Sequence, residues 1–401
     1  MNLEKYQQYS RIARGLEQAD LVLKDARIIN VFTEEIIRGD IAIQDGIIAG
    51  IGSFQGKEER DLGGKYVCPG FIDSHLHLES TLVTPAELVT VASRHGTTTF
   101  IVDPHESANV SGLAGIDYIL EQTEDVKANV YVMMPSCVPA TGIDDNGCTL
   151  TAQDMAPYLN NSRILGLGEV MDSISVVQGD KGMHDKLELF EGRIRDGHAP
   201  FLVEGDLQAY AMAGIATDHE CSFFDYAMRE RRNGLTILIR EGSAARNLEA
   251  LVGGLVQRKM NGEGFCFCTD DKHIEDIQQE GHIDHNVRKA IRLGMNSVSA
   301  IKMATINAAN CYGLKDKGAI APGRQADLLV LSDLVNVEVE DVYYKGQLID
   351  KNENIVIKPC ASELKNTVHV AEFSKEAFHL ESKDGTFPVI LCEEGQITTR
   401  K

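Results

Sequence analysis

One stretch of the chain decides its fold, Tyr66-Val-Cys-Pro-Gly-Phe-Ile-Asp-Ser-His-Leu-His77. Its first part, residues 66–72, is a short apolar run that predicts a buried strand. The two histidines that follow are two residues apart, so on an extended backbone they point to the same face and can grip one cation. A His-x-His pair alone is common and is more often found without a metal. Its meaning therefore depends on the rest of the chain.

Seven further apolar runs follow this stretch and alternate with helical patterns such as residues 85–94. Such alternation predicts parallel strands joined by crossover helices. Eight strands of this kind predict an α/β fold, a (β/α)8 TIM-type barrel. The runs are 66–72, 97–102, 130–134, 164–167, a weak one that ends near His198, the residues before Asp218, 235–239 and 264–268.

Short β-branched segments flank the barrel region on both sides, at residues 21–51 and 326–350, and Asp45-Gly46 is a hairpin turn signal. We expect the two flanks to build one small β-sandwich domain. The predicted organisation is 1–66 for the first part of the sandwich, 67–320 for the metal-dependent hydrolase barrel, 321–358 for the second part of the sandwich, and 359–401 for the start of an incomplete C-terminal domain.

The composition excludes several classes of protein. The 401 residues carry 39 Lys and Arg against 60 Asp and Glu, a net charge of −21, which repels phosphate backbones and anionic lipid. We therefore expect neither a nucleic acid nor a membrane as a partner. The first twenty residues lack an apolar export signal, and the nine cysteines form no disulfide framework. These features predict a cytoplasmic protein.

Polar residues follow several of the predicted strands, and the carboxyl ends of barrel strands share one face. Four histidines and two carboxylates in this position suit a pair of divalent metals, Zn, Mn or Fe, because imidazole and carboxylate prefer these ions. The candidate ligands are His75, His77, Glu169, His198, His219 and Asp270.

A metal pair of this kind would favour hydrolysis, because it lowers the pKa of bound water from 15.7 towards about 7. Asp270 comes last in the set and would take the proton of the water and pass it to a leaving group. Two alternatives stay open for Asp270. It can be a plain ligand, or it can cap the helix expected from Ile274.

The combined motifs resemble the amidohydrolase superfamily and, within it, the adenine deaminases. Pro69 to Ser80 is similar to the first-strand signature of the superfamily, and Gly323 to Leu331 is similar to the strand that returns to its β-sandwich. Further similar stretches are Ile101-Val-Asp-Pro-His-Glu106, Gly166-Leu-Gly-Glu169, Asp196-Gly-His-Ala-Pro200, His219-Glu220, Arg240-Glu-Gly-Ser-Ala-Ala-Arg-Asn247 and Cys268-Thr-Asp-Asp271.

The resemblance implies hydrolysis of adenine to hypoxanthine and ammonia, a reaction of purine salvage and catabolism. It also implies two divalent metal ions per chain, Mn²⁺ in the first place, with Fe²⁺ or Zn²⁺ as alternatives. By this resemblance, His75, His77 and Asp270 would hold one metal, and His198 and His219 the other. Glu169 would be either the bridging carboxylate or the acid that protonates the purine ring.

The resemblance assigns further roles that the residues alone leave open. Asp103 is similar to an active-site carboxylate of the family, although an Asp before Pro also starts turns. The stretch from Arg240 supplies candidates for the purine pocket, with ion pairs in a solvated loop as the alternative. These candidates are Arg240, Glu241, Ser243 and Arg246.

The chain departs from the adenine deaminases in two places. Phe201 stands where they usually have glycine, and they usually continue for a further domain beyond Lys401. Two alternatives therefore stay open. The chain can catalyse another amidohydrolase reaction, on a cyclic amide or an isoaspartyl peptide, or it can be a truncated relative that binds metal without catalysis. We expect a small-molecule purine substrate and a homo-oligomer, a dimer.

Overall fold

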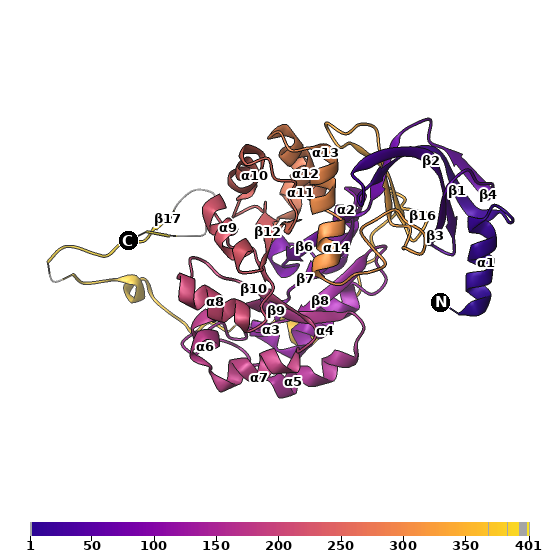
Figure 1. Ribbon diagram of the computed structural model, residues 1–401. Helices are drawn as coiled ribbons and strands as arrows, with labels where there is room; N and C mark the ends of the chain where they lie inside the picture. The colour runs from indigo at the N-terminus through magenta and orange to yellow at the C-terminus, as the bar shows by residue number, and fades with distance from the viewer. Residues whose placement is uncertain (1, 368, 383, 393–398, 401) are drawn as a thin grey trace.

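The computed structural model describes residues 2–367, 369–382, 384–392 and 399–400. Figure 1 shows a curved sheet with one helix at its outer edge, beside a larger part in which helices surround parallel strands. The curved sheet contains strands from both ends of the chain, and the parallel strands come from its middle. No helix of the described residues is long and apolar enough to cross a membrane.

The two flanks of the chain pair in one eight-stranded sheet, as the sequence predicts. Its order is β16-β15-β14-β5-β1-β2-β3, with β4 on β1. The strand bounds are β1 Ala19–Asn30, β2 Glu35–Gln44, β3 Ile47–Gly52, β4 Gly56–Asp61, β5 Tyr66–Pro69, β14 Leu328–Leu331, β15 Val339–Tyr344 and β16 Gln347–Leu348.

The hairpin predicted at Asp45-Gly46 joins β2 to β3. Gln44 pairs with Ile47, so the loop has two residues, and both have positive φ values, 50° and 75°. Two consecutive positive φ values define a type I′ turn, whose twist matches that of the strands. The local sequence therefore determines this register.

Strand β1 makes the sheet curl, because it changes its partner halfway along. Residues 19–24 pair with β4, and after a bulge between Leu23 and Ala26, Arg27 and Ile28 pair with β5. The edge strand β3 then comes back to the other flank of the chain, because Ile47 forms a β-bridge with Gln325, just before β14. The curl encloses its own apolar core, which includes Leu23, Ile28, Ile41, Ile43, Ile48, Val67, Leu328 and Val330.

The middle of the chain supplies eight parallel strands in two hydrogen-bonded groups. Five form the order β10-β9-β8-β7-β6, and three form β11-β12-β13. Their bounds are β6 Phe71–Leu76, β7 Thr97–Val102, β8 Asn129–Met134, β9 Ile164–Val170, β10 Ile194–Gly197, β11 Thr217–Asp218, β12 Thr236–Arg240 and β13 Phe265–Cys268.

The two parallel groups approach each other at both ends. At one end, Ala216 N donates to Arg195 O. At the other end, Asp270 N donates to His75 O and His77 N donates to Asp270 O. One apolar cluster also contains residues of both groups, Ile72, Ile101, Met133, Leu238, Cys266 and Cys268.

The prediction of a single strand over residues 66–72 is wrong. Tyr66–Pro69 is β5 of the flanking sheet, where it pairs with β1 and β14, and Phe71–Leu76 is β6 of the parallel group. Gly70 lies at the crossing, where a Cβ would come within 2.1 Å of Thr98 Oγ1. The chain can change sheets here only because this residue has no side chain. His75 consequently lies inside a strand rather than after one.

Helices connect most of the parallel strands. The helical pattern predicted at residues 85–94 is α2, which begins with Pro at its first position and a capping box between Thr84 and Glu87. The helices are α1 Leu3–Ala13, α2 Pro85–Arg94, α3 His105–Ser111, α4 Leu113–Gln122, α5 Ala152–Met155, α6 Ser173–Gln178, α7 Lys181–Leu189, α8 Glu204–Met212, α9 Phe224–Arg232, α10 Leu248–Gln257, α11 Ile274–Glu280, α12 Ile283–Arg292, α13 Ser297–Met303 and α14 Ile306–Cys311, with 3-10 turns at Glu79–Thr81, Ala156–Asn160, Ser362–Lys365 and Lys375–Phe378.

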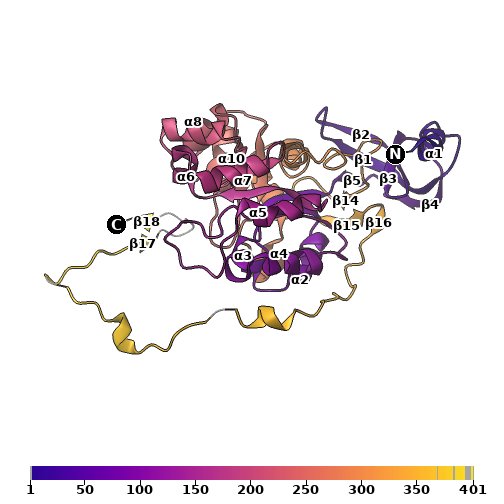
Figure 2. The same ribbon diagram turned by 90° about the horizontal axis from the view of Figure 1, so that it is seen from below.

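The C-terminal segment beyond residue 358 leaves the body of the molecule as an extended trace (Figure 2). Its apolar side chains are exposed, including Phe373, Phe378 and Phe387. Near its end, β17 Leu391–Cys392 pairs with β18 Thr399–Arg400.

Candidate metal centre

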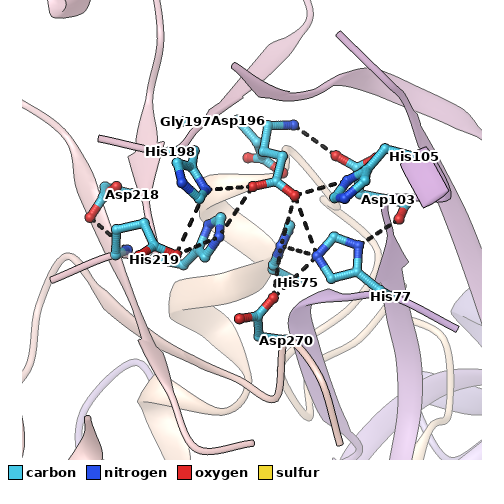
Figure 3. A network of polar contacts seen from close by, with 12 residues as sticks. His75, His77, Asp103, His105, Asp196, Gly197, His198, Asp218, His219 and Asp270 are labelled. Atoms are coloured by element: carbon cyan, nitrogen blue, oxygen red, sulfur yellow. Dashed lines mark hydrogen bonds and ion pairs between the residues drawn. The ribbon is translucent and has the colours of Figure 1, made fainter. Parts of the chain in front are cut away.

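The structure brings all six predicted ligands together, on or after the carboxyl ends of the parallel strands (Figure 3). Four of the candidate ligands come from three strands of the first group, and two come from two strands of the second group. They are His75 on β6, His77 just after it, Glu169 on β9, His198 after β10, His219 after β11 and Asp270 after β13. The shared face of parallel strands therefore gathers residues that are almost 200 positions apart.

Glu169 lies at the centre of the cluster, and its two oxygens face different histidines. Oε2 is 2.7 Å from His198 Nδ1 and 3.3 Å from His219 Nε2. Oε1 is 3.4 Å from His77 Nε2. The side chain is only 1% exposed. This geometry allows one carboxylate to serve two neighbouring cations.

His75, His77 and Asp270 form the first half of the cluster. The Nε2 atoms of the two histidines are 3.1 Å apart. Asp270 Oδ1 is 3.1 Å from His77 Nε2 and 3.6 Å from His75 Nε2. The alternation of side chains along a strand puts both rings on one face, as the sequence predicts.

The orientation of His77 is set by a second contact. Its Nδ1 lies 2.8 Å from the backbone oxygen of Asp103, which has no proton to give. Nδ1 must therefore carry a proton and donate it, so Nε2 is the nitrogen that can bind a cation.

The donor set fits divalent cations. The converging atoms are imidazole nitrogens and carboxylate oxygens, which Zn, Mn and Fe accept as ligands. In two groups, the three ligand atoms lie within 4.8 Å of one another, namely His75, His219 and Asp270, and Glu169, His198 and His219. Burying anions and lone pairs so close together is costly unless a cation lies between them.

Both carboxylates are in the form that binds metal. Burial alone would raise the pKa of Glu169, but hydrogen bonds from His105, His198 and His219 outweigh it and hold the pKa well below its usual range. Burial alone would also raise the pKa of Asp270, but contacts with His75 and His77 outweigh it and hold the pKa well below the usual range. Glu169 and Asp270 are therefore ionised at neutral pH.

The alternative role of Asp270 as a helix cap is wrong. Helix α11 begins at Ile274, and its N-cap residue is His273. Asp270 lies three residues earlier, with its carboxylate among the histidines. Its position after β13 thus serves the cluster.

The structure places Asp103 behind Glu169. Asp103 is fully buried, and its Oδ2 accepts a hydrogen bond of 2.8 Å from the backbone nitrogen of Glu169. A Cβ on Gly168 would come within 2.3 Å of the same oxygen, so the residue before Glu169 has to be glycine. The contact of Asp103 is with the backbone that carries the central ligand.

Arg240 is also part of the cluster, but protein groups occupy its guanidinium. Nη1 donates to Asp270 Oδ2 at 3.0 Å and to Glu220, and Nε lies 3.2 Å from Asn247 Oδ1. The side chain is 2% exposed. The carboxylates of Glu220 and Asp270 neutralise this buried cation, and its guanidinium in turn holds both carboxylates in place.

The other three predicted pocket residues join neighbouring helices. Glu241 accepts from Lys289 Nζ on α12 at 2.6 Å, and Ser243 Oγ donates to Asp276 on α11. Arg246 Nη1 lies 3.3 Å from Glu280 Oε2. In the described residues, these side chains therefore have ion-pair or hydrogen-bond partners outside the six-residue cluster. Their role towards a substrate stays a prediction.

Sequence reasoning did not include two residues of the cluster. His105 Nδ1 lies 3.0 Å from Glu169 Oε1, and Glu220 Oε1 lies 3.4 Å from His219 Nε2. The stretch Asp103-Pro-His105 contained the signal for His105, because it follows β7 as the other ligands follow their strands. Glu220 was not predicted, because two consecutive residues of a strand point to opposite faces and His219 already pointed to the site. The structure differs because β11 ends at Asp218 and the chain then bends.

Phe201 explains why glycine is usual at its position. Its φ is 58°, in the left-handed region that costs an ordinary residue about 1 kcal/mol. The ring packs against Phe223 and Tyr226, with centroids 5.9 and 5.5 Å away. The loop after His198 thus takes the left-handed turn without a glycine, and aromatic contacts hold it.

Glu230 near the His219 loop predicts a pH dependence of stability. It is buried on α9, Cys221 Sγ donates to its Oε2, and burial, followed by the nearby Asp218, raises its pKa to about 10. The folded chain therefore keeps a proton that the unfolded chain loses near pH 4.3. This contribution to stability is complete below that pH and declines as the pH rises towards 10.

We expect Glu230→Gln to flatten this decline, because glutamine is neutral at every pH. The gain in unfolding free energy at pH 9 should be at least about 1 kcal/mol. Urea unfolding of both proteins at pH 6 and pH 9 measures it, with Glu188→Gln on the exposed surface of α7 as the control. Parallel pH curves for the wild type and Glu230→Gln would show that Glu230 is not the source.

Comparisons with known proteins identify the family of the chain. The chain matches the amidohydrolase family over residues 66–349. It is 54% identical over 400 residues to an adenine deaminase of Desulfitobacterium hafniense (strain Y51) and 44% identical over 394 residues to one of Clostridium acetobutylicum. These alignments cover 100% and 97% of this chain, and 70% and 69% of the two relatives.

Solved structures of lower identity share the fold. An adenine deaminase has a TM-score of 0.62 at 18% identity, covering 83% of this chain and 100% of that one. The N-acetyl-D-glucosamine-6-phosphate deacetylase of Mycobacterium smegmatis has a TM-score of 0.63 at 16% identity, covering 82% and 100%. The family match over residues 66–349 and the relatives at 54% and 44% identity show that the chain belongs to the amidohydrolase family, in the group that includes these adenine deaminases.

Proposed function

We propose that the chain hydrolyses adenine to hypoxanthine and ammonia, as a step of purine salvage or catabolism. The observation that carries the proposal is the convergence of six residues, predicted from their places at strand ends and matched by the resemblance to adenine deaminases, into one cluster. Identity of 54% over the whole chain to a relative of that name supports the choice of substrate.

Two divalent cations per chain fit this cluster, Mn²⁺ in the first place and Fe²⁺ or Zn²⁺ as alternatives. His75, His77 and Asp270 would hold one, and His198 and His219 the other. When bound, such a cation lowers the pKa of water and so supplies hydroxide at neutral pH. The two oxygens of Glu169, directed at different halves of the cluster, support the bridging role over that of a proton donor.

Three side chains then have distinct tasks. Asp270 moves a proton from the attacking water to the leaving amino group, and its ionised state suits it to accept that proton first. Arg240 holds the other oxygen of Asp270 and so directs Oδ1 to the histidines. Asp103, predicted as catalytic, is supported as a positioning residue, because it holds the backbone of Glu169.

The purine pocket is proposed to lie on the side of Glu241, Ser243 and Arg246. The strand that ends at Arg240 leads directly into these residues. The side chain of Arg246 is 37% exposed and is therefore accessible to a substrate. Their ion pairs with α11 and α12 would then hold the pocket in shape.

The proposed architecture is a closed (β/α)8 barrel with a small β-sandwich. The backbone bonds at both ends of the two parallel groups and their shared apolar cluster support closure. The curl of the flanking sheet around its own core supports the sandwich. Three points stay predictions: the division at residues 66, 320 and 358, a dimeric assembly and a cytoplasmic location. Near the first division, Tyr66–Pro69 lies in the flanking sheet.

An assay on the purified chain tests the function. Protein loaded with Mn²⁺ is expected to remove the absorbance of adenine and release one ammonia per base, and the same protein after chelation should do neither. Two bound metal ions with no turnover of adenine would contradict the proposal and favour a non-catalytic relative. Turnover of a cyclic amide or an isoaspartyl dipeptide in place of adenine would favour the other amidohydrolase reaction.

A further inference from the structure

The backbone of Asp270 has a conformation that few residues other than glycine adopt. Its φ is 59°, in the left-handed region where the Cβ of an ordinary residue meets the carbonyl oxygen. A residue keeps this conformation only where its surroundings enforce it. The carboxylate of Asp270 faces His75 and His77 in this conformation, so whatever enforces it also places the carboxylate.

Asp73 makes three hydrogen bonds next to this strained residue. Its Oδ1 accepts from the backbone nitrogen of Thr269 at 3.1 Å, and its Oδ2 accepts from Thr269 Oγ1 at 2.6 Å. Oδ1 also lies 3.3 Å from the backbone nitrogen of His75. Asp73 and Thr269 are both fully buried, so water cannot replace these bonds. We call this pair the Asp73–Thr269 clamp.

The strand that carries the clamp also holds the backbone of Asp270 itself. Asp270 N donates to His75 O at 2.9 Å, and His77 N donates to Asp270 O at 3.1 Å. The residue before Asp270 and both of its own peptide groups are therefore attached to β6 or to His77, the first residue after it. This segment thus supplies two of the candidate ligands and fixes the third.

The ring of His282 borders the clamp on its other side. His282, at the start of α12, has Nε2 3.3 Å from Asp73 Oδ2. Its Nδ1 lies 2.8 Å from Thr97 Oγ1 on β7. All three side chains are fully buried. The carboxylate of Asp73 therefore lies between Thr269 and a buried imidazole, out of reach of water.

We infer that the Asp73–Thr269 clamp is a positioning device that keeps Asp270 in its left-handed conformation and so presents its carboxylate to the metal ligands and the reacting water. The hydroxyl of Thr269 is the part of the clamp that a substitution can remove without changing its shape. The inference rests on the proposed function for its effect on turnover, but not for its effect on metal binding.

Thr269→Val and Thr269→Ser form a matched pair of tests. Valine keeps the shape and the backbone nitrogen but loses the hydroxyl, and we expect kcat for adenine to fall about 10- to 100-fold with KM within about threefold. Serine keeps the hydroxyl and is expected to recover most of the lost kcat. A loss with serine as large as the loss with valine would show that only packing matters, and would overturn the inference.

Metal binding gives a readout that is independent of turnover. Calorimetric titration of the metal-free proteins with Mn²⁺ should show one of two sites weakened about tenfold or more in Thr269→Val, and near the wild type in Thr269→Ser. Unchanged affinity and unchanged kcat in Thr269→Val would overturn the inference. A wild type that binds Mn²⁺ but leaves adenine intact would contradict the proposed function alone, because the affinities would still test the clamp.

A third variant covers a valine protein that fails to fold. Thr269→Ala creates space instead of placing a methyl group beside the carboxylate, and it removes the same hydroxyl. Its kcat and Mn²⁺ affinity are expected to match the losses given for valine. Wild-type values in Thr269→Ala would overturn the inference.

Discussion

Glu169→Gln is expected to lower kcat for adenine by at least about a thousandfold and to leave the protein with less than two metal ions per chain. Glutamine has nearly the same shape but only one oxygen and no charge, so it cannot face both halves of the cluster as an anion. The structure makes the effect large, because Oε1 and Oε2 each lie against different histidines in a buried site. No water can take over either contact where the side chain is 1% exposed.

Metal analysis after Mn²⁺ loading and an adenine absorbance assay measure both effects. Glu188→Gln makes the same substitution on the exposed surface of α7 and should leave both values unchanged. If Glu169→Gln kept two metal ions while losing activity, Glu169 would be a proton donor and not a bridge. Full activity would remove Glu169 from the site altogether.

Asp270→Asn is expected to lower kcat by about a hundredfold to ten-thousandfold, the range that loss of general acid and base catalysis gives. Asparagine can still offer an oxygen to a cation, but it cannot accept the proton of water. It also leaves the guanidinium of Arg240 with a single carboxylate partner, Glu220, in a buried place. A buried charge that loses a partner costs free energy, so a modest loss of stability should accompany the loss of activity.

Rates at saturating adenine, with the Mn²⁺ content measured in the same samples, separate the two roles of Asp270. Retained metal with lost turnover would confirm proton transfer, whereas lost metal would show that Asp270 acts chiefly as a ligand. Asp206→Asn on the exposed face of α8 is the control and should behave as the wild type. An Asp270→Asn enzyme with wild-type kcat would contradict both roles.

Arg240 shows how the tertiary structure changed an interpretation. The resemblance to adenine deaminases made Arg240 a candidate for the purine pocket, with an ion pair in a solvated loop as the alternative. The structure instead places it between Glu220 and Asp270, with 2% of its side chain exposed. Because two protein carboxylates already neutralise it, the role proposed for it is to hold Asp270.

Much of the fold could be predicted because its signals are local. The turn at Asp45-Gly46, the helix at residues 85–94 and most of the eight parallel strands follow from patterns within a few residues. The strand break at Gly70 was not predicted, since the reason for it lies elsewhere. Thr98 comes so close that only glycine fits, and nothing near Gly70 in the sequence shows this approach.

The sequence by itself predicted the six candidate ligands, because each lies at or just after the end of a predicted strand and parallel strands end on one face. The tertiary structure alone decided how these residues act on one another. It showed that Glu169 divides its oxygens between two groups of histidines, that Glu220 turns in beside Arg240, and that Asp73 holds the residue before Asp270. Such contacts join strands that are up to about 200 residues apart, and they depend on register and bends that no local pattern encodes.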